Sequence, residues 1–160
     1  LKMETTDKNK NFFTSIAYNE VSIMRQTHQA AKINIKINDV ERMKELICDG
    51  VLVSTAAGST AYNLSAHGSI IPLDSHLLAL TPISAFRPRR WRGALLQEKT
   101  KIDLNVIDNY HRPASVTADH NEFRDIQSVK IQSSDKNYCT ILFDSAQSME
   151  ERILKEQFYS

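Results

Sequence analysis

The sequence predicts a mainly β fold that is built as a two-sheet sandwich. Apolar and polar residues alternate with period two in several segments, which is typical of half-buried antiparallel strands, and turn-forming pairs separate these segments. Helical periodicity is confined to a few short stretches. At 160 residues, with 41% hydrophobic and 24% charged residues, the chain has the size and composition of one folded domain, residues 1–160.

The strands are predicted from two kinds of apolar pattern. Alternating or strand-like segments occur, in chain order, at 1–5, 33–37, 102–106, 129–131 and 139–143. The continuous apolar runs at 51–55 and 77–80 are expected of strands buried on both faces. Turn residues lie between these segments at Asn38-Asp39, Asp49-Gly50, Asp108-Asn109, Arg112-Pro113 and Asp135-Lys136-Asn137. Because the chain opens directly on a strand, we expect it to be cut from a longer protein.

Helices are expected at two places. A short helix is predicted from about Thr60 to Ala66, and a second over 148–158, where Ser148 and Glu151 have the spacing of a capping box. The apolar residues of 40–47 fit a short helix or a strand equally well.

Charge and cysteine content exclude several classes of protein. The formal net charge is +1, so nucleic acid and anionic membrane surfaces are not expected partners. Only the run from Arg87 to Arg92 concentrates positive charge; such a run is most often a solvated face or an ion-pair donor, and it also suits a phosphate or a subunit partner. Cys48 and Cys139 lie in apolar runs, so we expect buried free thiols. With no apolar span and no signal peptide, the expected location is cytoplasmic.

The segment 49–62 carries the chemistry of the sequence. A buried strand runs into a turn of small residues and then into the start of a helix. Gly58 permits close approach of a ligand, and Ser59 and Thr60 are expected to cap the helix and leave N–H groups for phosphate or ribose oxygens. Tyr62 adds a ring that can stack on a base. An ordinary capped helix explains these residues equally well.

The order of several motifs resembles the NAD kinase family. In that family an Asp-Gly pair precedes a Thr-Pro-Thr-Gly-Ser-Thr-Ala-Tyr loop. The matching segments here are Asn19-Glu20-Val21, Asp49-Gly50, Val53-Ser54-Thr55, the run from Gly58 to Ala66, Leu80-Thr81-Pro82-Ile83, Phe86-Arg87-Pro88 and the Ser-Val-Thr-Ala-Asp strand that ends at Asp119. The resemblance covers essentially the whole chain, and it implies the β-rich C-terminal domain of a bacterial-type NAD kinase.

The resemblance also implies the site. It assigns NAD binding to Asn19, Glu20, Asp49, Thr55, Ser59, Thr60, Ala61, Tyr62, Ser65 and Asp119. A carboxylate such as Glu20 suits vicinal ribose hydroxyls, and an amide such as Asn19 both donates and accepts. Asp119 is expected near the reacting ribose, and it is the one candidate for a catalytic group. No metal ligand is assigned. Singly, each of these carboxylates fits a turn or a solvated strand end as well.

The implied activity is phosphorylation of the adenosine ribose 2′-hydroxyl of NAD, which gives NADP. The donor would be ATP or polyphosphate with a divalent metal such as Mg, and family members assemble as dimers or tetramers. The family's Gly-Gly-Asp-Gly motif belongs to an N-terminal α/β domain and is absent here, so we expect the fragment alone to be inactive. Two alternatives are a non-catalytic domain for dinucleotide binding or oligomerisation and a lipid kinase domain of the diacylglycerol-kinase type.

Overall fold

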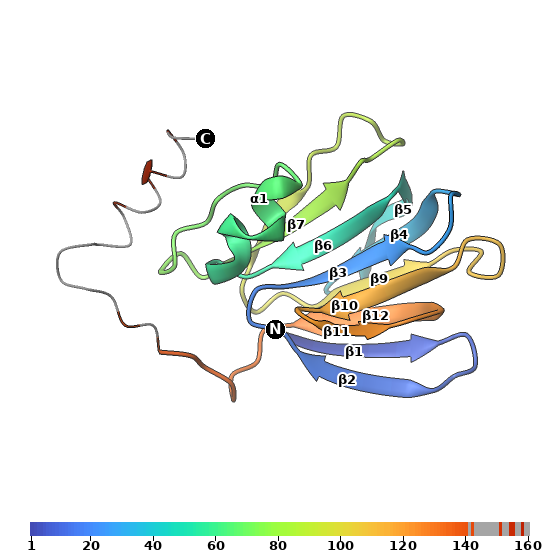
Figure 1. Ribbon diagram of the computed structural model, residues 1–160, viewed down its shortest axis with the longest axis horizontal. Coiled ribbons are helices and arrows are strands. Elements are labelled where there is room, and N and C mark those ends of the chain that lie inside the picture. The colour runs from blue at the N-terminus through green and yellow to red at the C-terminus, as the bar shows by residue number, and fades with distance from the viewer. Residues whose placement is uncertain (141, 143–150, 152–153, 156–157, 159–160) are drawn as a thin grey trace.

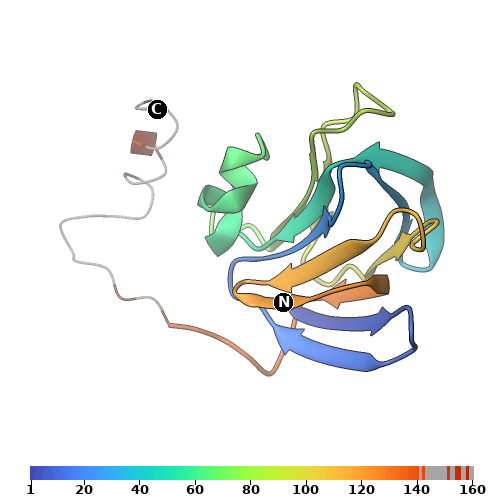
Figure 2. The ribbon, with the colours of Figure 1, turned by 45° about the vertical axis from the view of Figure 1, so that its right-hand side comes forward.

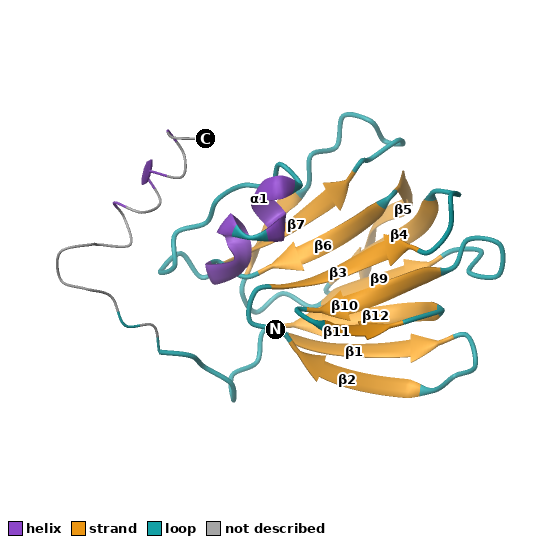
Figure 3. Cartoon of the chain, viewed as in Figure 1, coloured by secondary structure: helices purple, strands orange, loops and turns teal. Residues whose placement is uncertain are grey.

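Two antiparallel six-stranded sheets make up nearly all of the regular structure. The computed structural model describes residues 1–140, 142, 151, 154, 155 and 158. Within this part of the chain the fold is mainly β, as predicted, with one short helical segment beside the strands (Figures 1 and 3). No helix among the described residues has the length and apolar character that crossing a membrane requires.

The first sheet contains the first and the last of the described strands. Its strand order is β2 (Phe12–Ile16), β1 (Lys2–Asp7), β12 (Ile126–Gln132), β9 (Ile102–Val106), β4 (Ala31–Ile37) and β5 (Val40–Cys48). The ambiguous segment 40–47 is therefore a strand. It forms a hairpin with β4 through Asn38 and Asp39, which both have positive φ, so the predicted turn there is confirmed.

The second sheet carries the helical segment. Its strand order is β11 (Asn121–Phe123), β10 (Ala114–Ala118), β3 (Glu20–Arg25), β6 (Gly50–Ser54), β7 (Leu77–Ile83) and β8 (Ala94–Gln97). Between β6 and β7 the chain forms a 3-10 turn, η1 (Ala57–Thr60), and a helix, α1 (Tyr62–Ser65). The short helix predicted after the Gly-Ser-Thr loop is thus confirmed.

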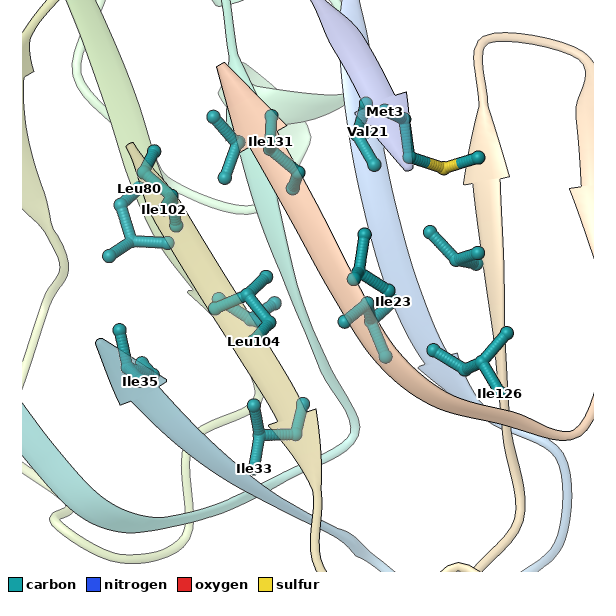
Figure 4. Close-up of a cluster of buried hydrophobic side chains, with 14 of the residues drawn as sticks. Met3, Val21, Ile23, Ile33, Ile35, Leu80, Ile102, Leu104, Ile126 and Ile131 are labelled. Atoms are coloured by element: carbon teal, nitrogen blue, oxygen red, sulfur yellow. The ribbon is translucent and has the colours of Figure 1, made fainter. Parts of the chain in front are cut away.

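The core lies between the two sheets. Inward side chains alternate along each strand, for example Ile33 and Ile35 on β4 and Val21 and Ile23 on β3, and all are fully buried (Figure 4). Each such side chain contributes about 1.5–3 kcal/mol on burial. The alternation turns Glu20, Ser22 and Met24 toward the opposite face of the second sheet, away from this core.

Four strands and the chain end were not correctly anticipated. The sequence signals missed β2, β8 and β11, which are short or largely exposed, and β3, whose three buried residues Val21, Ser22 and Ile23 follow one another without alternation. The prediction of a strand at 139–143 is wrong where it is described, because Cys139 and Thr140 belong to no strand. Cys139 is also exposed rather than buried, since no strand among the described residues follows β12. Most of the predicted helix 148–158 lies outside the described residues.

The direction of the strands determines at which end of the second sheet each candidate residue lies. Strand β3 starts at the end of the sheet where the helical segment lies, on the left of Figure 1, and strands β6 and β10 end there. The loop between β7 and β8 lies at the opposite, upper right end. Viewed from the side, the helical segment stands next to the strands rather than between the two sheets (Figure 2).

Candidate functional site

A turn at Tyr18, Asn19 and Glu20 is the centre of the candidate site. The Asp119 carboxylate accepts three successive backbone N–H groups of this turn, from Tyr18 at 2.6 Å, Asn19 at 3.0 Å and Glu20 at 3.1 Å. Asp119 follows β10 and has a φ of 51°, a left-handed conformation that aspartate adopts more readily than most residues. Its carboxylate therefore fixes the backbone of the turn.

The other side of the turn is held by the end of β6. Thr55 donates its backbone N–H to the Asn19 carbonyl at 2.9 Å, and its hydroxyl lies 2.8 Å from the Tyr18 carbonyl. A Cβ at Gly58 would lie 2.2 Å from the Asn19 carbonyl oxygen. Gly58 thus permits the close approach of the Asn19 backbone, and its predicted role in the approach of a ligand stays a prediction.

Glu20 has a buried carboxylate oxygen without a partner. Its Oε2 atom is the one buried side-chain N or O atom among the described residues that has no hydrogen bond. Burial, and next the negative charge of Asp119, raise the pKa of Glu20 above its ordinary value. The side-chain amide of neighbouring Asn19 makes no hydrogen bond within the described chain either. Because an unpaired buried polar atom is costly, the Glu20 oxygen can gain a hydrogen bond from a ligand, and the half-buried Asn19 amide lies next to it in sequence.

Tyr62, at the start of α1, reaches across the outward face of the second sheet. Its hydroxyl lies 3.5 Å from the Met24 sulfur, and burial followed by the charges of Glu20 and Asp49 raises its pKa. The phenol therefore keeps its proton at neutral pH, and its hydroxyl lies beside Met24 of β3, within the influence of both carboxylates. An aromatic ring in this place can stack on a planar group whose ribose reaches Glu20.

The Gly-Ser-Thr loop is held by a buried hydrogen-bond network. The hydroxyl of Ser59 donates to the Ala56 carbonyl at 2.7 Å and accepts the Ile71 N–H at 2.9 Å. Asn63 donates to the Ser59 carbonyl, and Thr81 on β7 donates to the Asn63 side-chain oxygen at 2.7 Å. The expectation that Ser59 and Thr60 cap the helix is wrong, because neither helical element has a side-chain cap.

The remaining predicted residues lie at different depths. Ser59 is fully buried, Thr60 and Ala61 are half-buried, and Ser65 is exposed at the end of α1. Sequence reasoning missed the roles of Asn63 and Thr81. Only the fold shows that Asn63 is the buried residue of α1 and that its partner on β7 is Thr81.

Asp49 is separated from this cluster. It precedes β6, whereas Thr55 follows it, and at a rise of about 3.3 Å per residue the two lie roughly 20 Å apart along the strand. Its carboxylate pairs with the Arg25 guanidinium at 2.6 Å. Burial, and next Asp49, raise the pKa of the adjacent Cys48 thiol to about 12, so this cysteine is buried and unreactive, as predicted.

A hollow of about 400 Å³ adjoins the turn at Tyr18 and Thr55, and Glu20 is not part of its lining. Its lining includes Tyr18, Thr55, Ala57, His76 and Cys139. The described residues contain no group of three or more histidine, cysteine, aspartate or glutamate side chains that could hold a metal ion. The geometry is therefore that of a binding surface with one free carboxylate, a free amide and an aromatic ring.

Comparison with known proteins identifies the relatives of this chain. The family model described as "ATP-NAD kinase C-terminal domain" matches residues 18–143. The chain is similar to an NAD kinase of Xylella fastidiosa, with 60% identity over 144 residues, which are 90% of this chain and 56% of that protein. It thus spans a little over half the length of the curated relative.

Two solved structures share the fold. Yeast NADH kinase, crystallised with NADH, superposes with a TM-score of 0.75 and 23% identity, covering 84% of this chain and 40% of that one. An NAD kinase from Archaeoglobus fulgidus in complex with ATP gives a TM-score of 0.68, again at 23% identity, over 84% of this chain and 50% of that one. At this identity the two structures support the β-sandwich architecture alone.

Proposed function

The chain belongs to the NAD kinase family, of which it is a C-terminal domain, and on that premise we propose that it provides the NAD-binding surface of an enzyme that phosphorylates NAD. The acceptor would be the 2′-hydroxyl of the adenosine ribose. The proposed binding residues are those named from the sequence, with Asn19, Glu20 and Tyr62 as the groups that contact the dinucleotide directly.

The unpaired Glu20 oxygen carries the proposal. A carboxylate that is buried and left without a donor favours a ligand with hydroxyl groups, and the vicinal hydroxyls of a ribose offer two such donors. The Asn19 amide lies next to it on the same turn and can both donate and accept. Since Asp119 and Thr55 already hold the backbone of this turn, the ligand does not have to order it, which favours affinity.

Asp119 has a positioning role in this proposal. Both of its oxygens already accept backbone N–H groups, so the general base that deprotonates the ribose hydroxyl would come from the part of the protein that contains the Gly-Gly-Asp-Gly motif. The catalytic contribution of this chain is then to hold the hydroxyl in line with the donor, as phosphoryl transfer requires.

The proposal also covers the phosphate donor, the oligomeric state and the cellular location of the protein. We take the donor to be ATP or polyphosphate, with Mg²⁺ arriving bound to the phosphates, because the carboxylates near the turn do not by themselves form a metal site. We take the protein to be a homo-oligomer, a dimer or tetramer, that acts in the cytoplasm. The two free cysteines are in keeping with a reducing compartment.

The test is calorimetric titration of NAD into the whole protein that contains this chain. Replacing Glu20 by Ala or Gln is expected to weaken NAD binding by about tenfold or more, because a charge-assisted hydrogen bond contributes about 1.5–3 kcal/mol. Glu122→Gln is the matched control: this carboxylate pairs with Arg124 on the surface, and its removal should leave NAD affinity unchanged. Equal affinities for all variants would contradict the proposal.

A further inference from the structure

The loop between β7 and β8, residues 84–93, concentrates positive charge. We call it the arginine loop. It holds Arg87, Arg89, Arg90 and Arg92, and no aspartate or glutamate occurs between Asp74 and Glu98. The whole sequence has a formal charge of +1, so without these four arginines the remainder would carry −3. The four arginines therefore make this loop a local concentration of positive charge.

The backbone of the arginine loop is anchored at both ends. Near its start, Ile47 on β5 donates its N–H to the Arg87 carbonyl at 2.8 Å and accepts the Phe86 N–H at 2.8 Å. At its end, Gly93 has a φ of 105°, and a Cβ there would lie 2.2 Å from the Leu80 carbonyl. Half-buried Trp91 packs against the core. The loop thus presents its arginines from a fixed frame.

The guanidinium groups of this loop have no acidic partner among the described residues. Arg89 lies over the exposed ring of Phe86, 5.2 Å from its centroid, which orients it without using its N–H groups. In contrast, Arg25 and Arg124 pair with carboxylates and Arg112 donates to the Ala30 carbonyl. The four exposed guanidinium groups repel one another, and the anchored backbone keeps them close together. An anion with several negative charges would therefore stabilise them.

We propose that the arginine loop binds a ligand that contains two or more linked phosphate groups, such as inorganic polyphosphate or the triphosphate of a nucleotide. Arginine forms bidentate hydrogen bonds to phosphate, and a phosphate chain brings several charges within the span of a short loop, whereas a single carboxylate satisfies only one guanidinium. The loop is separate from the turn at Tyr18, Asn19 and Glu20, because β7 runs away from the helical segment and the loop begins at its far end (Figure 1).

The test is titration of tripolyphosphate, ATP and an oligo-glutamate peptide into the whole protein, with calorimetry and fluorescence as readouts. Trp91 is the one tryptophan of the sequence, so the fluorescence change that disappears in Trp91→Phe reports on the loop itself. In an Arg90→Gln, Arg92→Gln double variant, tripolyphosphate binding at the loop should weaken by about tenfold or more. Tighter binding of ATP than of tripolyphosphate would assign the site to nucleotides, and affinity for tripolyphosphate equal to or above that for ATP would assign it to the phosphate chain of polyphosphate.

The control keeps the same change in charge at another surface. Lys101→Gln with Lys130→Gln removes two positive charges from the outward face of the first sheet, and tripolyphosphate binding should persist. Arg90→Lys with Arg92→Lys keeps the charge and should still lose affinity, because lysine lacks the bidentate fork. NAD affinity should be unchanged in every loop variant, so failure here is distinguishable from failure at Glu20. Equal effects in the loop and control variants, no Trp91-dependent signal, or equal affinity for oligo-glutamate would overturn the proposal.

Discussion

The charged side chains at the two ends of the second sheet have different roles. At the end where β3 starts, Asp119 is bonded to three backbone N–H groups, and Glu20 keeps one oxygen free. At the other end, Asp49 pairs with the Arg25 side chain on the surface, and the arginine loop has no acidic partner among the described residues. A carboxylate that holds backbone fixes geometry, whereas exposed side-chain charges mainly shape the electrostatic potential. Mutations at the first end should therefore change stability most.

The largest effect is expected from Asp119→Asn. Asparagine tolerates the positive φ, but its amide turns an NH₂ group toward N–H donors that need acceptors, and the charge that strengthens these hydrogen bonds is lost. The cost should be about 2–4 kcal/mol, which lowers the Tm by roughly 5–10 °C for a chain of this size. Thermal unfolding followed by circular dichroism measures this loss.

Asp125→Asn is the matched control for that prediction. Asp125 also has a positive φ, of 56°, but its carboxylate only meets Lys8 at 3.1 Å on the surface. Its loss should cost less than about 1 kcal/mol. Equal destabilisation by the two substitutions would show that Asp119 acts through its conformation and not through the N–H groups of the turn.

Thr81→Val should have the next largest effect. The substitution keeps the shape of a side chain that is 3% exposed, and it leaves the buried Asn63 oxygen without its hydroxyl donor. The expected cost is about 1–3 kcal/mol. The same change at Thr117 on β10, where the hydroxyl makes no hydrogen bond within the described chain, should be close to neutral. If both variants unfold at the same temperature, the network under the Gly-Ser-Thr loop does not stabilise it.

The residues changed in these two pairs of variants also show what the sequence alone does not predict. The sandwich follows from local pattern: the alternation in 33–37 and 102–106 predicts β4 and β9 because each strand has one buried face. The roles of Asp119 and Asn63 depend on partners 99 to 101 and 18 residues away in sequence. No local pattern encodes those contacts. The resemblance to a family named the candidate residues, and only the fold shows that Asp119 holds the backbone of the turn whereas Glu20 keeps an oxygen unpaired.

Glu20→Gln should raise stability, in contrast to the first two substitutions. Because the folded state raises the pKa of Glu20, keeping it charged at neutral pH costs free energy that glutamine does not. The cost disappears as the pH falls through the raised folded pKa to below the unfolded value, where the carboxyl is protonated in both states. We expect the variant to gain about 1 kcal/mol, or roughly 2–4 °C in Tm, at pH 7 and nothing at pH 3.

The pH profile separates this effect from a general change in surface charge. Glu122→Gln removes the same charge from an exposed pair with Arg124 and should not raise the Tm at pH 7. Melting curves of both variants between pH 3 and pH 7 give the comparison. A gain at Glu20 that is independent of pH would mean that repacking, and not the buried charge, explains it. A loss at pH 7 would mean that Glu20 already has a partner in the folded protein.

The smallest change in stability is expected from Asp49→Asn. The pair with Arg25 is about one-third exposed on each side, so its loss should cost no more than about 1 kcal/mol and less at high salt. NAD affinity is the informative readout, because Asp49 lies roughly 20 Å from Thr55. It can contact the ligand that binds at the turn only if that ligand extends along β3 past Tyr62. We expect NAD binding to weaken in calorimetric titration while the fold is preserved. An unchanged affinity would restrict the NAD surface to the end of the sheet that Asp119 holds, and Asp49 would then belong, with the arginine loop, to the charged end of the sheet.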